Sequence, residues 1–200
     1  MIVFAFPPQA AQETDAYWLS GIDYDTGTAA GSLIVVPEGC HVPAGADAPV
    51  FCMDAAAEEG TILRKTDHSG GTGSDVWISS RLSGGTLEDR ITQAMEASAG
   101  RLWLNIAPLC TRFSMPCPTG TGDALTREES LEIQRNCPAF FSPELCCMYC
   151  VQIEHAHAHM HLFDTTQTVA EKLRLASALG VPYVFGDIPP DAVIRKTPLP

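Results

Sequence analysis

The sequence predicts an α/β protein with a parallel sheet, because one unit of helix, glycine and strand occurs twice. The first unit begins at Thr86, ends its helix at Gly100 and continues into an apolar strand at 102–106 (LWLNI). The second ends its helix at Gly180 and continues into an apolar strand at 181–185 (VPYVF). Glycine commonly supplies the left-handed residue that ends a helix. A short, almost wholly apolar run is typical of a strand buried on both faces of a parallel sheet.

The second helix has a clear start and one apolar face. Asp164 or Thr165 is a candidate N-cap, because a short oxygen-bearing side chain accepts a hydrogen bond from an unpaired N–H of the first turn. Glu171 and Lys172 are predicted to lie on the polar side of the helix. The residues that recur at helical spacing on its apolar side are Val169, Leu173 and Ala176.

The first 85 residues contain short strands and almost no helix to cover them. The predicted strands are residues 2–6, 16–25, 32–36, 50–53 and 61–64, with a single helical turn at 55–59, a loop at 38–48 and a turn at 67–75. A parallel sheet needs helices on its faces, so this part does not complete a regular α/β unit. We expect one α/β domain over residues 1–200, with an alternative boundary near residue 75.

The part between the two repeated units is predicted to hold a loop, a helix and a hairpin. Residues 108–122 are rich in Pro, Cys and Gly and are predicted to form a loop. Thr126 and Glu129 match a capping box at the start of a helix that ends near Asn136. Two extended runs, 145–153 and 155–163, follow and are predicted to pair as an antiparallel hairpin.

The charge balance limits the partners. The chain has 24 acidic and 12 basic residues, a net charge of −12, which repels phosphate backbones, so we expect no nucleic-acid partner. No apolar run reaches membrane-spanning length, and the first residues lack the basic start of a signal peptide, so we expect no membrane partner and, by default, a cytoplasmic location. A partly covered first half would expose apolar surface, which predicts self-association or a protein partner.

The cysteines have no regular spacing. We expect free, buried thiols that behave as small apolar side chains rather than a disulfide framework. Within the run CCMYC, a strand would place Cys146 and Cys150 on one face and Cys147 on the other. The eight cysteines are residues 40, 52, 110, 117, 137, 146, 147 and 150.

Asp23 and Asp25 are candidate catalytic residues. They lie two apart in GIDYD, so on a strand both carboxylates point to one face. Paired carboxylates suit acid–base catalysis, because crowding separates their pKa values. The alternative is that an aspartate before Thr-Gly closes a turn.

Histidines alternate in the sequence HAHAHMH, at residues 155, 157, 159 and 161. On a strand all four side chains leave the same face, and His157 and His159 could then ligate zinc or another transition metal. The alternative is a hairpin strand with a polar, solvated face.

The order of segments resembles the last third of a family 18 glycoside hydrolase barrel, of the chitinase-like type found in bacterial spore-wall and peptidoglycan proteins. The resemblance is carried by residues 101–122 (RLWLNIAPLCTRFSMPCPTGTG), the helix 125–134 (LTREESLEIQ), the hairpin and residues 162–187. Phe163-Asp164 matches the "FeD" of the family's "vWFeDarS". Upstream, residues 20–27 (SGIDYDTG) are similar to the catalytic strand motif "DGxDxDxE".

This resemblance implies a parallel (β/α) barrel or a truncated, partial TIM barrel with an inserted β-hairpin. Asp25 and Asp23 match the last two aspartates of the motif, whereas Ser20 replaces its first aspartate and Gly27 replaces the proton-donating glutamate. Loss of a general acid lowers the rate by about 10²–10⁴-fold. The resemblance therefore implies a degenerate, non-catalytic domain that binds an N-acetylated carbohydrate or a protein partner and needs no cofactor.

The resemblance also assigns candidate binding residues and leaves two alternatives open. The candidate substrate-binding residues are Asp67, Phe113 and Asp187, the last at the position of the family's sugar-stacking tryptophan. One alternative is an active glycosidase on polymers that contain N-acetylglucosamine, with Glu38 or Asp67 as a displaced acid. The other is a metal-dependent enzyme that uses the histidine strand.

Overall fold

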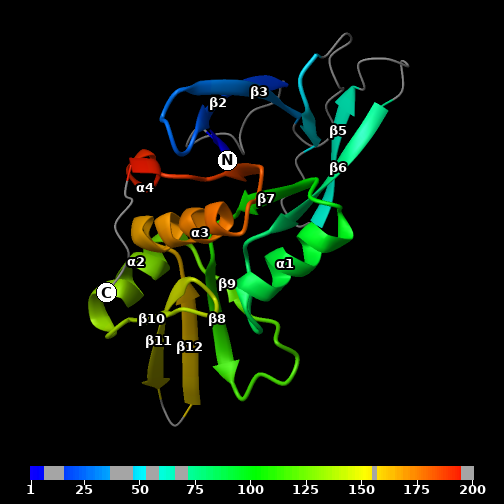
Figure 1. The fold of residues 1–200 in the computed structure, drawn as a ribbon. Helices are drawn as coiled ribbons and strands as arrows, with labels where there is room; N and C mark the ends of the chain where they lie inside the picture. Colours follow the sequence, from blue (N-terminus) through cyan, green and yellow to red (C-terminus); the bar gives the residue numbers. More distant parts are fainter. Residues whose placement is uncertain (7–15, 37–46, 53–58, 66–71, 155–156, 195–200) are drawn as a thin grey trace.

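A closed barrel of eight strands forms the centre of the molecule (Figure 1). The computed structural model describes residues 1–6, 16–36, 47–52, 59–65, 72–154 and 157–194. Around the barrel the strand order is β1-β13-β7-β6-β5-β4-β3-β2. The barrel strands are β1 (Ile2–Ala5), β2 (Tyr17–Asp23), β3 (Ala29–Val36), β4 (Val50–Cys52), β5 (Glu59–Lys65), β6 (Thr72–Ser79), β7 (Leu102–Ile106) and β13 (Tyr183–Gly186).

The predicted α/β fold class with a parallel (β/α) barrel is wrong. The described residues form mostly strands with four short helices, and the barrel is mixed. Strands β1, β13, β7 and β6 run parallel to one another. On the other side, β1–β2, β2–β3, β4–β5 and β5–β6 are antiparallel, and only β3–β4 is parallel. Residues 24–28 between β2 and β3, and 66–71 between β5 and β6, are too few for a helical crossover. Such short connections join antiparallel neighbours, so this half has hairpins where a (β/α) barrel has helices.

Both repeated units of helix, glycine and strand are confirmed. Helix α1 (Leu87–Ala97) is capped by Thr86, whose hydroxyl accepts from the Asp89 amide, and α3 (Thr166–Ala178) is capped by Thr165. Gly100 and Gly180 have φ angles of 79° and 74°. Strands β7 and β13 pair in parallel, as the repeat predicts. In Figure 1, α1 and α3 lie beside each other over these strands.

Aromatic side chains fill the barrel interior. Trp103 of β7 stacks on Tyr183 of β13 with ring centroids 4.3 Å apart, and its indole N–H donates to the buried Asp75 at 2.8 Å. The interior cluster also contains Phe4, Leu19, Leu33, Val35, Phe51, Ile62, Trp77 and Phe185. The barrel is therefore a packed core.

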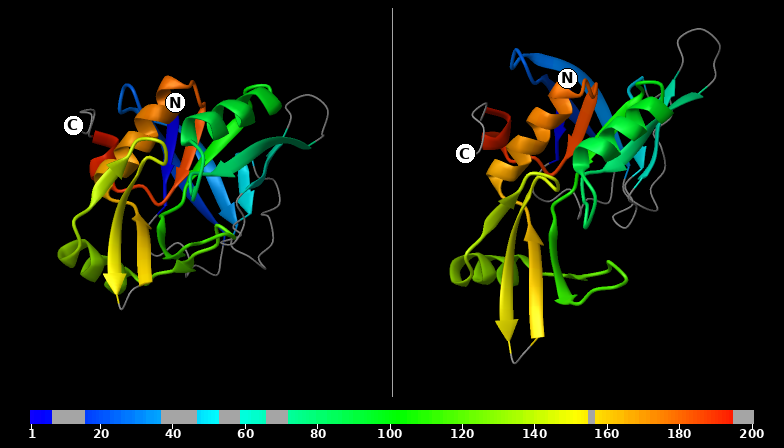
Figure 2. Two further views of the ribbon diagram at one scale, coloured as in Figure 1. Left: turned by 90° about the horizontal axis from the view of Figure 1, so that it is seen from below. Right: turned by 60° about the horizontal axis from the view of Figure 1, so that its bottom comes forward.

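A second sheet is inserted between β7 and α3, in the order β10-β11-β12-β8-β9. Figure 2 shows it projecting from the barrel, with α2 (Arg127–Asn136) beside it. The predicted hairpin is confirmed by the antiparallel pairing of β11 and β12, and the capping box of Thr126 and Glu129 is present. The strands of this inserted sheet are β8 (Cys110–Met115), β9 (Asp123–Ala124), β10 (Phe140–Ser142), β11 (Cys147–Glu154) and β12 (His157–Phe163).

Several local predictions are wrong. Residues 72–75 belong to β6 and residues 110–115 to β8, although both were predicted as turn or loop. In β6 the polar Asp75 faces the barrel interior, so the alternation that marks a strand is hidden. A short helix, α4 (Pro190–Ile194), was not predicted at all. Cys146 has a φ of 49° and precedes β11, so it does not share a strand face with Cys150.

Other sequence-based expectations concern residues only partly described. The helical turn at 55–59 and the loop at 38–48 lie mostly outside the described residues. Every cysteine that the structure describes is a free thiol, as predicted, but only Cys146, Cys147 and Cys150 are buried, so the predicted burial is wrong for the other four described cysteines. In the described ranges, no helix combines the length and apolar character that crossing a bilayer requires. The outer face of β2 exposes Trp18 (57%) and Ile22 (42%), and self-association through such surface stays a prediction.

Candidate functional site

The two ends of the barrel carry different groups. We call the end at which the parallel strands β1, β13, β7 and β6 finish the carboxyl mouth, and the end at which they begin the amino mouth. In parallel α/β folds, ligands bind at the carboxyl ends of the strands, because loops of variable sequence converge there. We therefore expect a binding site at the carboxyl mouth.

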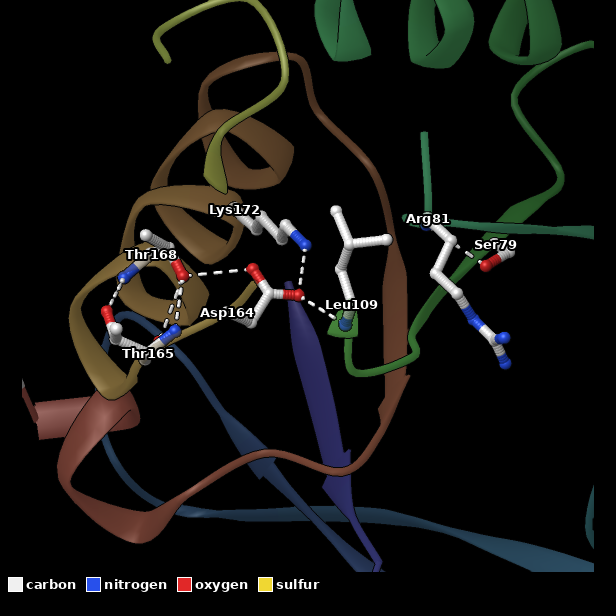
Figure 3. A network of polar contacts seen from close by, with 7 residues as sticks. All are labelled: Ser79, Arg81, Leu109, Asp164, Thr165, Thr168 and Lys172. Carbon is white, nitrogen blue, oxygen red and sulfur yellow. Dashed lines mark hydrogen bonds and ion pairs between the residues drawn. The ribbon is translucent and has the colours of Figure 1, made fainter. Parts of the chain in front are cut away.

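A buried network centred on Asp164 lies beside this mouth (Figure 3). Its Oδ2 accepts hydrogen bonds from the Lys172 ammonium at 2.7 Å and from the Leu109 amide at 2.9 Å. Its Oδ1 accepts from the Thr168 hydroxyl at 2.9 Å. Thr165 and Thr168 complete a reciprocal capping box at the start of α3. Both carboxylate oxygens are thus engaged by donors from three directions.

The prediction that Lys172 lies on the polar side of α3 is wrong. Its side chain is 0% exposed and that of Asp164 is 5% exposed. A buried ammonium needs a paired anion, because removing a charge from water costs several kcal/mol. Long side chains on a helix point back toward its N-terminus, which brings Lys172 to the aspartate that precedes α3. A signal was available in the sequence: Lys172 is three residues after Val169 and four before Ala176, inside the apolar face.

The network joins the two ends of the inserted sheet. Leu109 immediately precedes β8 and Asp164 immediately follows β12. The Asp164 amide donates to the Leu109 carbonyl at 2.8 Å, while the Leu109 amide donates to the Asp164 carboxylate. These hydrogen bonds and the ion pair therefore fasten together the segments that enter and leave the inserted sheet, and we call this region the neck.

A cavity of about 590 Å³ opens next to this neck, and we call it the mouth cavity. It lies between the carboxyl mouth, α2 and the start of α3. Its polar lining residues are Ser130, Gln134, Asp164, Thr165, Thr166 and Asp187, and its apolar lining includes Pro108, Leu109, Leu125, Leu131, Val169 and Pro189. Asp187 is exposed, directly after β13.

The predicted binding residues fall in different places. Asp187 lines the mouth cavity, and its role in binding stays a prediction. Phe113 is only 4% exposed and packs with Leu109 and Leu162, so most of its ring is buried in the inserted sheet. Asp67 lies outside the described residues.

The predicted catalytic pair lies at the amino mouth, because Asp23 pairs with Ile2 at the start of β1. Strand β2 ends at Asp23, so the prediction that Asp23 and Asp25 share a strand face is wrong. Asp23 Oδ1 accepts from the amides of Asp25 and Thr26 at 3.0 and 2.9 Å and from the Thr26 hydroxyl at 3.1 Å. The Thr26 hydrogen bonds hold the pKa of Asp23 below its ordinary value. Asp25 lies 3.7 Å from the N-terminal amine. The structure therefore does not bring Asp23 and Asp25 to the same mouth as Asp187.

The histidines of β12 become more buried along the strand. His157 is exposed, His159 is half-buried and contacts the Ser114 hydroxyl at 3.3 Å, and His161 is buried. The alternation of His157, His159 and His161 on β12 agrees with the predicted shared face, whereas His155 lies outside the described residues. In the part of the chain that the structure describes, no three His, Cys, Asp or Glu side chains are grouped so as to hold a metal ion. Metal binding by His157 and His159 stays a prediction.

Comparison with known proteins yields partial structural matches only. No family model matches the sequence, and no curated protein does. The spore cortex-lytic enzyme SleL of Bacillus megaterium aligns with a TM-score of 0.44 and 8% identity over 56% of this chain and 29% of that chain. SleL of Bacillus cereus aligns with a TM-score of 0.41 and 9% identity over 50% and 25%. A chitinase of Chromobacterium violaceum aligns with a TM-score of 0.44 and 17% identity over 58% and 42%.

These matches are partial and do not show family 18. The chain spans between about a quarter and two fifths of the length of the proteins it matches. At such identities and TM-scores, the likeness assigns no activity and no substrate to this chain.

Proposed function

We propose that this chain is a non-catalytic, glycoside hydrolase-like domain that binds an N-acetylated carbohydrate in the mouth cavity. The observation that carries the proposal is the cavity itself, with about 590 Å³ and a lining that combines carboxylate, hydroxyl and amide groups with apolar side chains. Ligand pockets in proteins occupy about 300–1,000 Å³ and combine apolar surface with a few placed polar groups.

The lining matches the chemistry of an N-acetylated sugar. Sugar hydroxyls donate to carboxylates, and the exposed carboxylate of Asp187 accepts such bonds. The Gln134 amide both donates and accepts, as does each hydroxyl of Ser130 and Thr166. An acetamido group needs one donor, one acceptor and an apolar contact for its methyl group, and Val169 and Pro189 offer apolar surface.

The carboxylates argue against catalysis. Cleavage of a glycosidic bond by general acid catalysis needs a carboxyl group that donates a proton to the leaving oxygen. Among the described residues that line the cavity, the only carboxylates are Asp164 and Asp187. Asp164 already accepts three hydrogen bonds, one of them from an ammonium, so it acts as an acceptor rather than a proton donor. Among the described residues of the cavity lining, no carboxyl group besides Asp187 is then available as a proton donor.

Calorimetric titration with N-acetylglucosamine oligomers tests the proposal. We expect saturable heat with the wild-type protein, and about tenfold weaker binding in Asp187→Asn, because one hydrogen bond to a charged group is worth about 1.5–3 kcal/mol. Asp25→Asn is the matched control, since that exposed carboxylate lies at the amino mouth. It should bind as the wild type does.

Three results would overturn the proposal. The first is no heat at millimolar ligand with the wild-type protein. The second is weaker binding in Asp25→Asn with normal binding in Asp187→Asn. The third is turnover of a chromogenic N-acetylglucosamine oligomer between pH 4 and 8, which would establish the active-glycosidase alternative instead.

A further inference from the structure

We propose a second binding site at the carboxyl mouth, for an oxyanion carried by a small molecule. The site is a separate cavity of about 560 Å³, which we call the arginine cavity because Arg81 and Arg90 line it. Leu109 lines both this cavity and the mouth cavity. The inference does not depend on carbohydrate binding, since it uses different polar residues.

The charge of the lining is opposite to that of the chain. The protein has 24 acidic and 12 basic residues, yet the described residues that line the arginine cavity include two arginines and no acidic side chain. A concave site lined by one sign of charge focuses the field and concentrates ligands of the opposite sign. The cavity therefore favours an anion within an otherwise acidic protein.

The backbone of each arginine is held by a hydrogen bond to a nearby residue. Arg81 follows β6, and its amide donates to the Ser79 hydroxyl at 3.1 Å (Figure 3). Arg90 lies in α1, and its amide donates to the Thr86 carbonyl at 3.2 Å. Both arginines are half-buried. A guanidinium has five N–H donors, so each can bind a ligand in addition to its protein partners.

The wall of the cavity that the turn at Gly122 forms depends on a close approach of that turn to β8. A Cβ on Gly122 would lie 2.5 Å from Thr111 Cγ2 and 2.7 Å from the Arg112 carbonyl oxygen, so only glycine lets this turn pack on β8. The wall offers the hydroxyls of Thr111 and Thr121, and Ser83 adds a third from the loop before α1. These uncharged donors suit an oxygen-rich anion.

The ligand class follows from these groups. Arginine forks pair with the two oxygens of a carboxylate or a phosphate in bidentate fashion. A cavity of about 560 Å³ is larger than either group alone, so the oxyanion is expected on a larger molecule. Phosphate and carboxylate share this chemistry, and separate titrations distinguish them.

The experiment uses inorganic phosphate and acetate as probes, followed by amide shifts in heteronuclear NMR at low ionic strength. We expect saturable shifts at residues 82–84 and 120–122 with at least one probe, and the probe that saturates identifies the anion. Arg90→Gln should weaken this binding about tenfold or more, the usual loss for a charge-assisted hydrogen bond. Arg101→Gln is the matched control, because that exposed arginine precedes β7 at the amino mouth.

Two further variants guard against a loss caused by misfolding. Arg90→Lys keeps the charge but loses the bidentate fork, and Ser83→Ala removes one exposed hydroxyl, so both should weaken binding to an intermediate extent. Added salt should also weaken it. The proposal is overturned if neither phosphate nor acetate gives saturable shifts. It is also overturned if Arg101→Gln weakens anion binding as much as Arg90→Gln does.

Discussion

The amino and carboxyl mouths of the barrel both carry aspartates, but the two sets have different surroundings. At the amino mouth, Asp23 closes a solvent-exposed turn after β2, and Asp25 is largely exposed. At the carboxyl mouth, Asp164 is buried and paired with the buried Lys172. The Asp23 carboxylate therefore stabilises a local turn, while the Asp164 carboxylate fastens the inserted sheet.

The difference teaches that burial, more than residue type or spacing, decides what a carboxylate does. The Asp23 partners lie within three residues of it, so its hydrogen bonds need no distant segment. The partners of Asp164 include Leu109, 55 residues away, and Lys172, eight residues away. Only the hydrogen bonds of Asp164 depend on the tertiary structure, so only they are lost when the inserted sheet separates from α3. Stability measurements at the two mouths should therefore differ strongly.

Lys172→Met is expected to have the largest effect. Methionine keeps an apolar stem but leaves the Asp164 carboxylate buried without its cation. Removing one partner of a buried ion pair costs about 3–5 kcal/mol of unfolding free energy. Urea unfolding followed by circular dichroism measures the loss.

Arg174→Met on the same helix is the matched control for that variant. Arg174 pairs with Glu171 in a partly exposed position, where an ion pair contributes about 0.2–1 kcal/mol. The double variant Asp164→Asn, Lys172→Met should be more stable than Lys172→Met alone, because no unpaired charge remains. Equal losses in Lys172→Met and Arg174→Met would show that the network does not hold the neck.

High pH should lower the unfolding free energy of the protein through the buried thiol of Cys147. Burial raises the pKa of Cys147 from 9.0 to about 12, with Asp164 adding to the rise and Lys172 opposing it. The unfolded chain ionises this thiol above about pH 9 while the folded chain keeps its proton, so stability falls as pH rises from there toward 12. By pH 10 the loss from this group is about 1 kcal/mol.

The comparison of unfolding free energies at pH 8 and pH 10 isolates this contribution. Cys147→Ala should lose about 1 kcal/mol less than the wild type over that interval. Cys52→Ala is the control, because its thiol is exposed, and it should follow the wild type. If Cys147→Ala shows the same pH slope as the wild type, the thiol is not the source of the change.

Asp23→Asn is expected to have a small effect, in the opposite pH range. Hydrogen bonds from Thr26 lower the pKa of Asp23 below 3.8, so its ionised form stabilises the fold above that pH. This contribution is lost as pH falls through the lowered pKa. Thermal unfolding midpoints should differ slightly between the variant and the wild type near neutral pH and converge below pH 3.8.

Asp25→Asn provides the comparison at the same mouth. Its carboxylate is largely exposed and lies 3.7 Å from the N-terminal amine, so we expect a still smaller change in the midpoint. A loss in Asp23→Asn as large as that in Lys172→Met would remove the distinction between the two mouths.

The sequence by itself determined the elements whose signals are local. Thr86, Thr165 and Gly180 set the ends of α1 and α3 through hydrogen bonds and φ angles within a few residues. The apolar runs that follow these helices gave β7 and β13, and their parallel pairing followed from the repeated unit. Caps, glycines and short-range periodicity need no knowledge of the rest of the chain.

Only the tertiary structure decided how these elements close and where the polar groups go. The mixed barrel depends on hairpins in the first half, and β6 was hidden because Asp75 faces inward to the Trp103 indole. The sequence pattern predicts Lys172 as a surface residue, whereas in the structure it is buried and paired with Asp164. Such pairings join residues from separate elements, and their energy depends on burial, which a linear sequence does not display. For that reason the sequence located the capped helices and the strands after them, but not the mixed barrel or the distance between the Asp23 turn and Asp187.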